Sequence, residues 1–156
     1  MKGSPTFQGL TRETLEEHRQ INFYLDQIAQ TLQTLTPDLD GVEPIRRLAA
    51  QLAGLRERLI EHHHAEEKGG LFRAILETLP ACRVEIDRLT VQHAKIIEIL
   101  EMARLHAQRG SAADAPALRE DLERFLAMFR KHEHDEELLL VQAGEKEANS
   151  FDGSDA

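Results

Sequence analysis

The sequence has very little cysteine and few aromatic residues. Of its 156 residues, one is cysteine (Cys82), none is tryptophan, and Phe, Trp and Tyr together make up 4%. A single cysteine excludes a disulfide framework and a cysteine metal cage. Glycine and proline, with nine and five residues, are too few for a fold of many short strands and turns. These absences favour a helical protein.

Positive charge and long apolar runs are also scarce. Lys and Arg number 19 against 28 Asp and Glu, which gives a net charge of −9. A surface of this sign argues against nucleic acid as a partner. No run approaches the ~18 apolar residues of a membrane span, and MKGSPTFQGL at the start lacks the apolar segment of a signal peptide. The sequence predicts a cytoplasmic protein that binds neither nucleic acid nor membrane.

Apolar residues recur with the helical period of about 3.6 residues along most of the chain. Helices are predicted over residues 11–35, 40–79, 80–110 and 114–144, and Gly69-Gly70 loosens the second. Short connections join antiparallel neighbours, so the predicted fold is all-α, an up-down-up-down four-helix bundle. We expect an N-terminal arm over 1–10, the bundle over 11–143 and an acidic disordered tail over 144–156.

Polar residues interrupt the apolar stripe of every predicted helix. They are His18, His62, Glu66, His93, His132 and Glu136. The second helix matches the fourth at an offset of 70 residues, which pairs His62-x-x-x-Glu66 with His132-x-x-x-Glu136. The first matches the third at an offset of 75, which pairs His18 with His93. Each half of the chain therefore supplies one inward His and one inward His-x-x-x-Glu.

Counting residues from the shared turns, at about 1.5 Å each, places the four histidines near one level of the bundle. Burying six such groups together costs several kcal/mol unless they share a strong partner, and a pair of metal ions is one. Four His and two Glu without Cys suit iron or manganese better than structural zinc. A metal-free core in which these groups hydrogen-bond one another stays open as an alternative.

The neighbouring residues offer other combinations. His63 and Glu67 have the same i, i+4 spacing as His62 and Glu66, but Glu133 stands where the repeat would match His63. A ferritin-like Glu61-x-x-His64 fails because its repeat position is Lys131. For the remaining candidates we expect solvated positions, or positions beside the ligands or in the core: His64, His106, His134, Glu67, Glu137, Tyr24 and Cys82.

Four segments carry a resemblance to a known family. They are EHRQI at 17–21, HHHAEE at 62–67, QHAKI at 92–96 and HEHDEELLL at 132–140. In this order and spacing they resemble the hemerythrin-like, or HHE cation-binding, family over about residues 11–141. The resemblance implies a non-haem centre of two iron ions, for which manganese or zinc could substitute. The four histidines would be terminal ligands, and Glu66 and Glu136 would bridge the irons beside an oxo or hydroxo group.

Two positions depart from the oxygen-carrying members of the family. Those have a second histidine one turn after the third-helix ligand, where this chain has Ile97, and they end with His-x-x-x-x-Asp rather than His132-x-x-x-Glu136. (Glu137 has the longer spacing but lies off the stripe.) The lost nitrogen leaves a more open coordination position, which argues against a reversible oxygen carrier. The chain is more similar to the di-iron domain of repair-of-iron-centres proteins and to bacterial sensor or stress-response members.

The function expected from this resemblance is binding or sensing of a diatomic gas (O2 or NO) or peroxide, or the handling of iron. The alternative is a di-iron enzyme of oxidative or nitrosative stress defence, which would act on peroxide or nitric oxide or repair iron–sulfur clusters. A structural bundle with incidental metal affinity is a third hypothesis.

Overall fold

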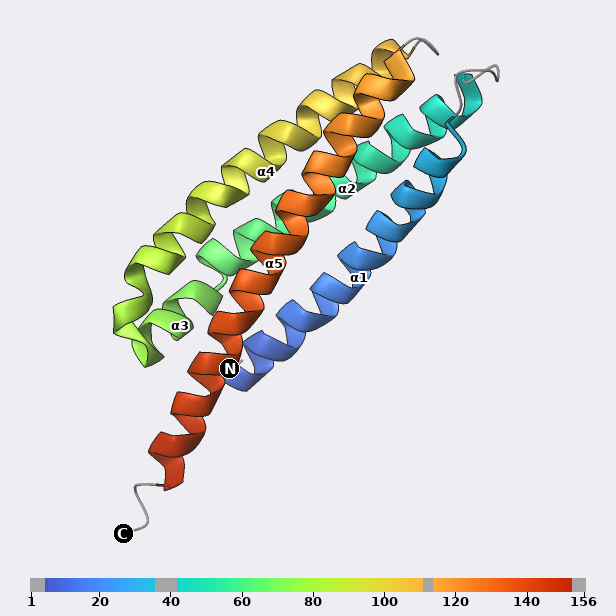
Figure 1. Ribbon diagram of the computed structural model, residues 1–156. Helices are drawn as coiled ribbons and strands as arrows, with labels where there is room; N and C mark the ends of the chain where they lie inside the picture. Colours follow the sequence, from blue (N-terminus) through green and yellow to red (C-terminus); the bar gives the residue numbers. More distant parts are fainter. Residues whose placement is uncertain (1–4, 36–41, 111–113, 153–156) are drawn as a thin grey trace.

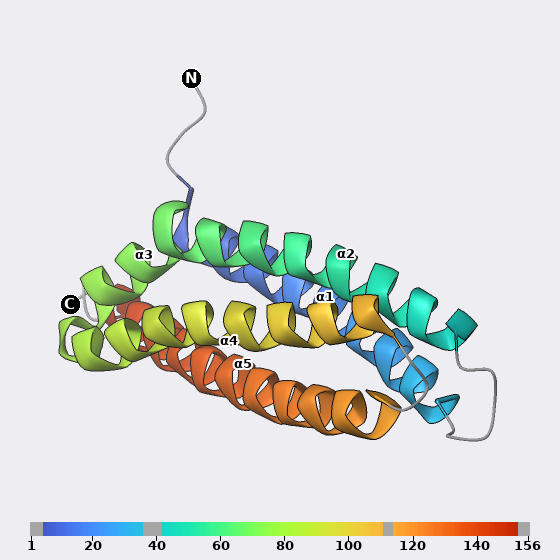
Figure 2. The same ribbon diagram turned by 90° about the horizontal axis from the view of Figure 1, so that it is seen from above.

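The computed structural model describes residues 5–35, 42–110 and 114–152, and they form a bundle of helices. The elements are α1 (Phe7–Gln33), α2 (Val42–Lys68), α3 (Leu71–Thr78), a 3-10 turn (Pro80–Cys82), α4 (Arg83–Arg109) and α5 (Ala115–Asp152). Figures 1 and 2 show α1, α2, α4 and α5 side by side, with each reversing the direction of the one before. The predicted up-down-up-down four-helix bundle is confirmed. None of the described helices is long and apolar enough to cross a membrane.

The helix ends follow from local chemistry. Thr6 caps α1, because its hydroxyl accepts a hydrogen bond from the backbone N–H of Gly9 at 3.0 Å. Gly70 has φ of +110°, a left-handed conformation that favours glycine, and it separates α2 from α3. The short α3 then turns aside at one end of the bundle before α4 begins (Figure 2). The predicted start of the second helix, at residue 40, lies outside the described residues.

The structure differs from the sequence expectation at both ends of the chain. Helix α1 begins at Phe7, within the expected arm, and α5 continues through Gly144 to Asp152, where a disordered tail was expected. One interior glycine costs a helix only ~1 kcal/mol relative to alanine. Leu139, Leu140 and Ala143 are buried just before it and hold the helix in place. In Figure 1, α5 extends beyond the ends of the other helices.

The buried apolar residues form two clusters. The first apolar cluster fills the half of the bundle near the α1–α2 and α4–α5 connections, and includes Ile21, Leu25, Leu52, Leu55, Leu59, Ile96, Leu100, Leu122, Phe125 and Phe129. The second apolar cluster fills the end where α3 packs, with Leu71, Phe72, Ile75, Ile86, Leu89, Leu139, Leu140 and Ala143. The polar stripe residues occupy the level between the two clusters. Apolar side chains therefore enclose that level from both directions along the bundle.

Candidate metal centre

The six polar stripe residues converge at one level of the bundle. They are His18 from α1, His62 and Glu66 from α2, His93 from α4, and His132 and Glu136 from α5. Each side chain is buried, with no more than 4% of the residue exposed. Their ligand atoms form two sets, and within each set the atoms lie within 4.8 Å of one another. Both sets contain Glu66 and Glu136; the first adds His18 and His62, and the second adds His93 and His132.

Each of the two carboxylates spans both histidine pairs. Oε1 of Glu66 contacts Nε2 of His62, and its Oε2 lies 3.0 Å from Nε2 of His93. Oε1 of Glu136 lies 3.0 Å from Nε2 of His18, and its Oε2 lies 3.5 Å from Nε2 of His132. One oxygen of each carboxylate therefore faces each pair. This arrangement would let a metal ion at each pair share both carboxylates.

Several inward atoms of this cluster lack hydrogen bonds, whereas Nε2 of His18 lies 3.1 Å from Nε2 of His62. Both oxygens of Glu66, both oxygens of Glu136 and Nε2 of His93 are buried and have no hydrogen-bond partner among the described residues. The imidazole contacts that surround them are close in distance but do not have hydrogen-bond geometry. Buried polar atoms are normally paired, so a group of unpaired lone pairs directed at one space fits a metal ion. The donor set of nitrogen and carboxylate oxygen suits iron, manganese or zinc.

In each of the four histidines, the outward nitrogen contacts an oxygen atom from a neighbouring helix. Nδ1 lies 3.1 Å from Glu137 in His18, 3.2 Å from Glu67 in His93 and 2.8 Å from Gln92 in His132, and in His62 it contacts Glu17. Carboxylate and amide oxygens accept hydrogen bonds, so Nδ1 donates in each contact, and a neutral imidazole held in this way carries its lone pair on Nε2. The outer contacts thus prepare all four imidazoles to bind metal.

These outer partners follow the sequence repeats. Glu67 and Glu137 are 70 residues apart, and both were expected outside the stripe or beside the ligands. Glu17 and Gln92 are 75 residues apart and were missed, although each directly precedes a predicted ligand. The same two offsets that relate the ligands could have found them. Glu17 and Gln92 lie outside the apolar stripes, so the helical period alone does not indicate them.

Without a metal, the cluster holds protons. Burial lowers the pKa of His18, but the Glu136 and Glu66 carboxylates outweigh it and raise that pKa to about 11. Burial also lowers the pKa of His62, whereas Glu17 and Glu66 raise it to a net value of about 9. Burial raises the pKa of Glu66, but its three imidazole neighbours bring it well below the ordinary value. A metal ion that binds here must displace these protons.

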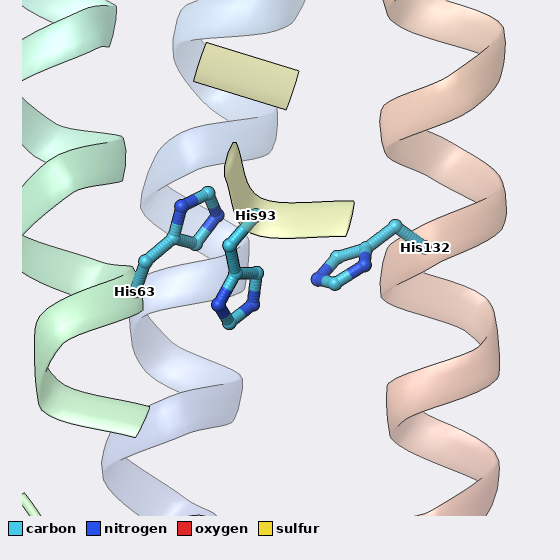
Figure 3. A group of neighbouring side chains, drawn as sticks. All are labelled: His63, His93 and His132. Atoms are coloured by element: carbon cyan, nitrogen blue, oxygen red, sulfur yellow. The ribbon is translucent and has the colours of Figure 1, made fainter. Parts of the chain in front are cut away.

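His63 is buried beside the centre, with 5% of the residue exposed. Its ring stacks on His93 with centroids 3.8 Å apart and planes 7° apart. Figure 3 shows His63, His93 and His132 approaching one another from α2, α4 and α5. Burial, and next the charge of His93, lower the pKa of His63 to about 2, so its imidazole is neutral. The alternative pair of His63 with Glu67 does not form inside the bundle, because Glu67 is exposed.

The remaining candidates lie away from the centre. His64 and His134 are exposed. His106, expected at the surface, is half-buried and pairs with Asp121 of α5 at 2.9 Å. Tyr24 packs on the first apolar cluster beneath the guanidinium of Arg58. The half-buried Cys82 packs on the second apolar cluster.

Comparison with known proteins agrees with this geometry. A model of the hemerythrin HHE cation binding domain matches residues 10–143. No curated protein and no solved structure gave a significant match. Because the family match spans most of the chain and the buried His/Glu cluster lies within it, the chain belongs to the hemerythrin HHE cation-binding domain family.

Proposed function

We propose that the protein binds two iron ions and uses them to bind or sense O2, nitric oxide or peroxide, or to handle iron. His18 and His62 would hold one ion, His93 and His132 the other, and Glu66 and Glu136 would bridge them. The observation that carries the proposal is that each buried carboxylate directs one oxygen to each histidine pair. Two bound irons would supply Lewis-acid positions and a redox pair for a small ligand.

The choice of metal follows from the ligand atoms. Imidazole nitrogen and carboxylate oxygen are intermediate to hard ligands, and no thiolate is present in the set. Such a set suits iron and manganese, and zinc can replace them because it accepts the same ligands. Manganese and zinc are therefore competitors of iron, and an experiment has to exclude them by controlled loading.

Access to the centre favours a small ligand. A pocket of about 120 Å³ between α1 and α2 reaches Glu66 and is also lined by Thr14, Glu17 and Gly69. A second pocket, of about 200 Å³, reaches His62. Sites for larger organic ligands are typically ~300–1,000 Å³. Both pockets open toward the His18–His62 side, so a diatomic gas or peroxide would approach that metal position.

Anaerobic reconstitution with Fe²⁺ tests the proposal. We expect two irons per chain by metal analysis, and a near-UV absorption band that appears or shifts when O2 or nitric oxide is added to the reduced protein. Parallel loading with Mn²⁺ and Zn²⁺ provides the control, because the zinc form has no redox chemistry and should not respond. An iron content well under one per chain would contradict the proposal.

An enzyme that turns over peroxide or nitric oxide is the second candidate, and Glu133 is the observation that favours it. This carboxyl group is half-buried near His18, accepts a hydrogen bond from Asn22 at 2.7 Å, and burial raises its pKa. Such a group can hold and deliver a proton beside His18. We expect Glu133→Gln to slow turnover while the iron content stays at two per chain. Full turnover in Glu66→Ala or His132→Ala protein would show that the activity does not belong to this centre.

A further inference from the structure

We propose that a pocket between α1 and α5 binds a small organic cation, an amine with an apolar body. The volume of this pocket is about 630 Å³, within the ~300–1,000 Å³ typical of sites for organic ligands. The pockets that reach Glu66 and His62 are smaller, at about 120 Å³ and 200 Å³. The α1–α5 pocket can therefore hold a larger molecule than the openings toward the metal centre.

The pocket lies where the C-terminal part of α5 passes the start of α1. Figure 1 shows α5 continuing beyond α1, and the two helices are in contact. The apolar part of the lining comes from Phe7 and Leu15 of α1 and from Leu140, Gly144 and Ala148 of α5. Gly144 and Ala148 are one turn apart, and a Cβ added at Gly144 would come within 4 Å of Phe7 alone. Two small residues thus leave open a space that larger side chains would fill.

Two residues of the lining carry polar atoms without a hydrogen-bond partner. Oγ1 of Thr11 and Oε2 of Glu147 are buried, and no residue in the described ranges forms a hydrogen bond with either. Buried polar atoms normally have a partner, and an unpaired one is destabilising. A hydroxyl oxygen and a carboxylate oxygen both accept hydrogen bonds. A ligand that donates hydrogen bonds from the pocket would therefore satisfy both atoms.

The charges of the lining favour a cation. Glu147 is half-buried, and no cationic side chain of the described residues pairs with it. Arg12 is the other charged residue of the lining, but it is exposed, so water screens its charge. The carboxylate is screened less because apolar side chains surround it. An ammonium group beside Glu147 would form a charge-assisted hydrogen bond, and the apolar body of the ligand would contact the rest of the lining.

The pocket is separate from the metal centre. Its lining contains none of the four histidines and neither of the two bridging carboxylates. Leu15 precedes His18 by three residues and Leu140 follows Glu136 by four, so the lining begins about one helical turn from the centre. An amine bound here would leave the metal ligands in place, and the inference does not rest on the proposed function.

The test uses three probes that share an indole ring and differ in charge: tryptamine, a cation; tryptophol, which is neutral; and indole-3-acetate, an anion. The protein has no tryptophan, so indole fluorescence comes from the probe alone. Fluorescence anisotropy of each probe, titrated with the full chain as purified and after treatment with a chelator, measures the three affinities. Because the chain has a net charge of −9, a control must separate binding in the pocket from general attraction of cations.

We expect tryptamine to bind most tightly and indole-3-acetate least tightly. Glu147→Gln should weaken tryptamine binding about 10-fold or more, because it removes the charged acceptor. Glu145→Gln is the matched control: it changes the net charge equally at an exposed position of α5 and should match wild type. Thr11→Val keeps the shape of the side chain without Oγ1 and should weaken binding about 3- to 10-fold.

Gly144→Leu places a side chain in the pocket and should abolish binding of all three probes. If this variant does not fold, Ala148→Leu makes the same comparison one turn later. The inference is overturned by equal affinity for tryptamine and indole-3-acetate, by wild-type affinity in Glu147→Gln, or by no tryptamine binding at ~1 mM protein. Iron content does not enter these measurements, so their outcome is independent of the proposed function.

Discussion

Nδ1 of His18 in α1 lies 3.1 Å from Oε1 of Glu137 in α5. The side chain of Glu137 is 42% exposed, so this contact joins a buried imidazole to a carboxylate at the solvent boundary. Such a partner orients the ring and increases the basicity of the nitrogen on the other side. Glu137 supplies no ligand atom to the proposed metal positions, so its contact with His18 gives a prediction of its own.

Replacing Glu137 by alanine is expected to weaken metal binding by about 10- to 100-fold, because His18 loses the partner that fixes its tautomer. A chelator competition assay with anaerobically loaded protein measures the change. Glu145→Ala is the control, since Glu145 is exposed on the same helix. Equal affinities for the two variants would show that the Glu137 contact does not support the centre.

Glu66 and Glu67 are adjacent in sequence but differ in position, since 1% of Glu66 is exposed and Glu67 lies outside against His93. Glu66→Ala removes a carboxylate shared by both metal positions, so we expect less than one iron per chain after reconstitution. Glu67→Ala should keep two irons with an affinity lowered about 10-fold or more. Metal analysis after gel filtration distinguishes them. Retention of two tightly bound irons in Glu66→Ala would refute its assignment as a bridging ligand.

The metal-free protein should lose stability as pH rises above neutrality. The pKa values of His18 and His62 are raised from 6.5 to about 11 and about 9, so their contributions are complete below 6.5 and disappear toward those values. Glu66, whose pKa is lowered from 4.5, contributes above that pH and loses its effect in acid. Melting temperatures of protein freed of metal by a chelator, measured from pH 4 to 10, test the expected loss of stability at high pH and in acid. A melting temperature that rises between pH 7 and 9 would contradict this.

Metal binding should show the opposite dependence on pH. Because the protons on His18 and His62 must leave before iron binds, the apparent affinity rises with pH. Calorimetric titrations in two buffers of different ionisation enthalpy measure the number of protons released. We expect net release at pH 7; no release would mean that these imidazoles are already neutral without metal.

Gly144→Ala is expected to stabilise the protein by ~0.5–1 kcal/mol, because Gly144 lies inside α5 and alanine is the better helix former. An added Cβ would approach only Phe7, at an ordinary contact distance of 3.9 Å. Gly70→Ala is the contrasting variant and should destabilise, since φ at Gly70 is +110°. Chemical denaturation measures both changes. A Gly144→Ala variant that is less stable than wild type would show that this residue ends the helix in solution.

Much of the fold follows from local patterning. The helical period of the apolar residues predicted the long helices, and Gly69-Gly70 correctly marked the break between α2 and α3. Gly144 misled because a glycine can end a helix or be tolerated inside one. Burial of Leu140 and Ala143 against the second apolar cluster decides between the two, and that packing is not visible in a short sequence window.

The sequence by itself determined which residues could share one level of the bundle, because the repeats and the 3.6-residue period fix depth and face. The structure brings together the six residues of these stripes, His18, His62, His93, His132, Glu66 and Glu136. Only the tertiary structure decided what surrounds them. His63 and Glu67 have the spacing of a ligand pair, yet His63 is buried and Glu67 is not. The cause is the placement of α4 against α2, since a contact between helices depends on their packing and not on the spacing along either one.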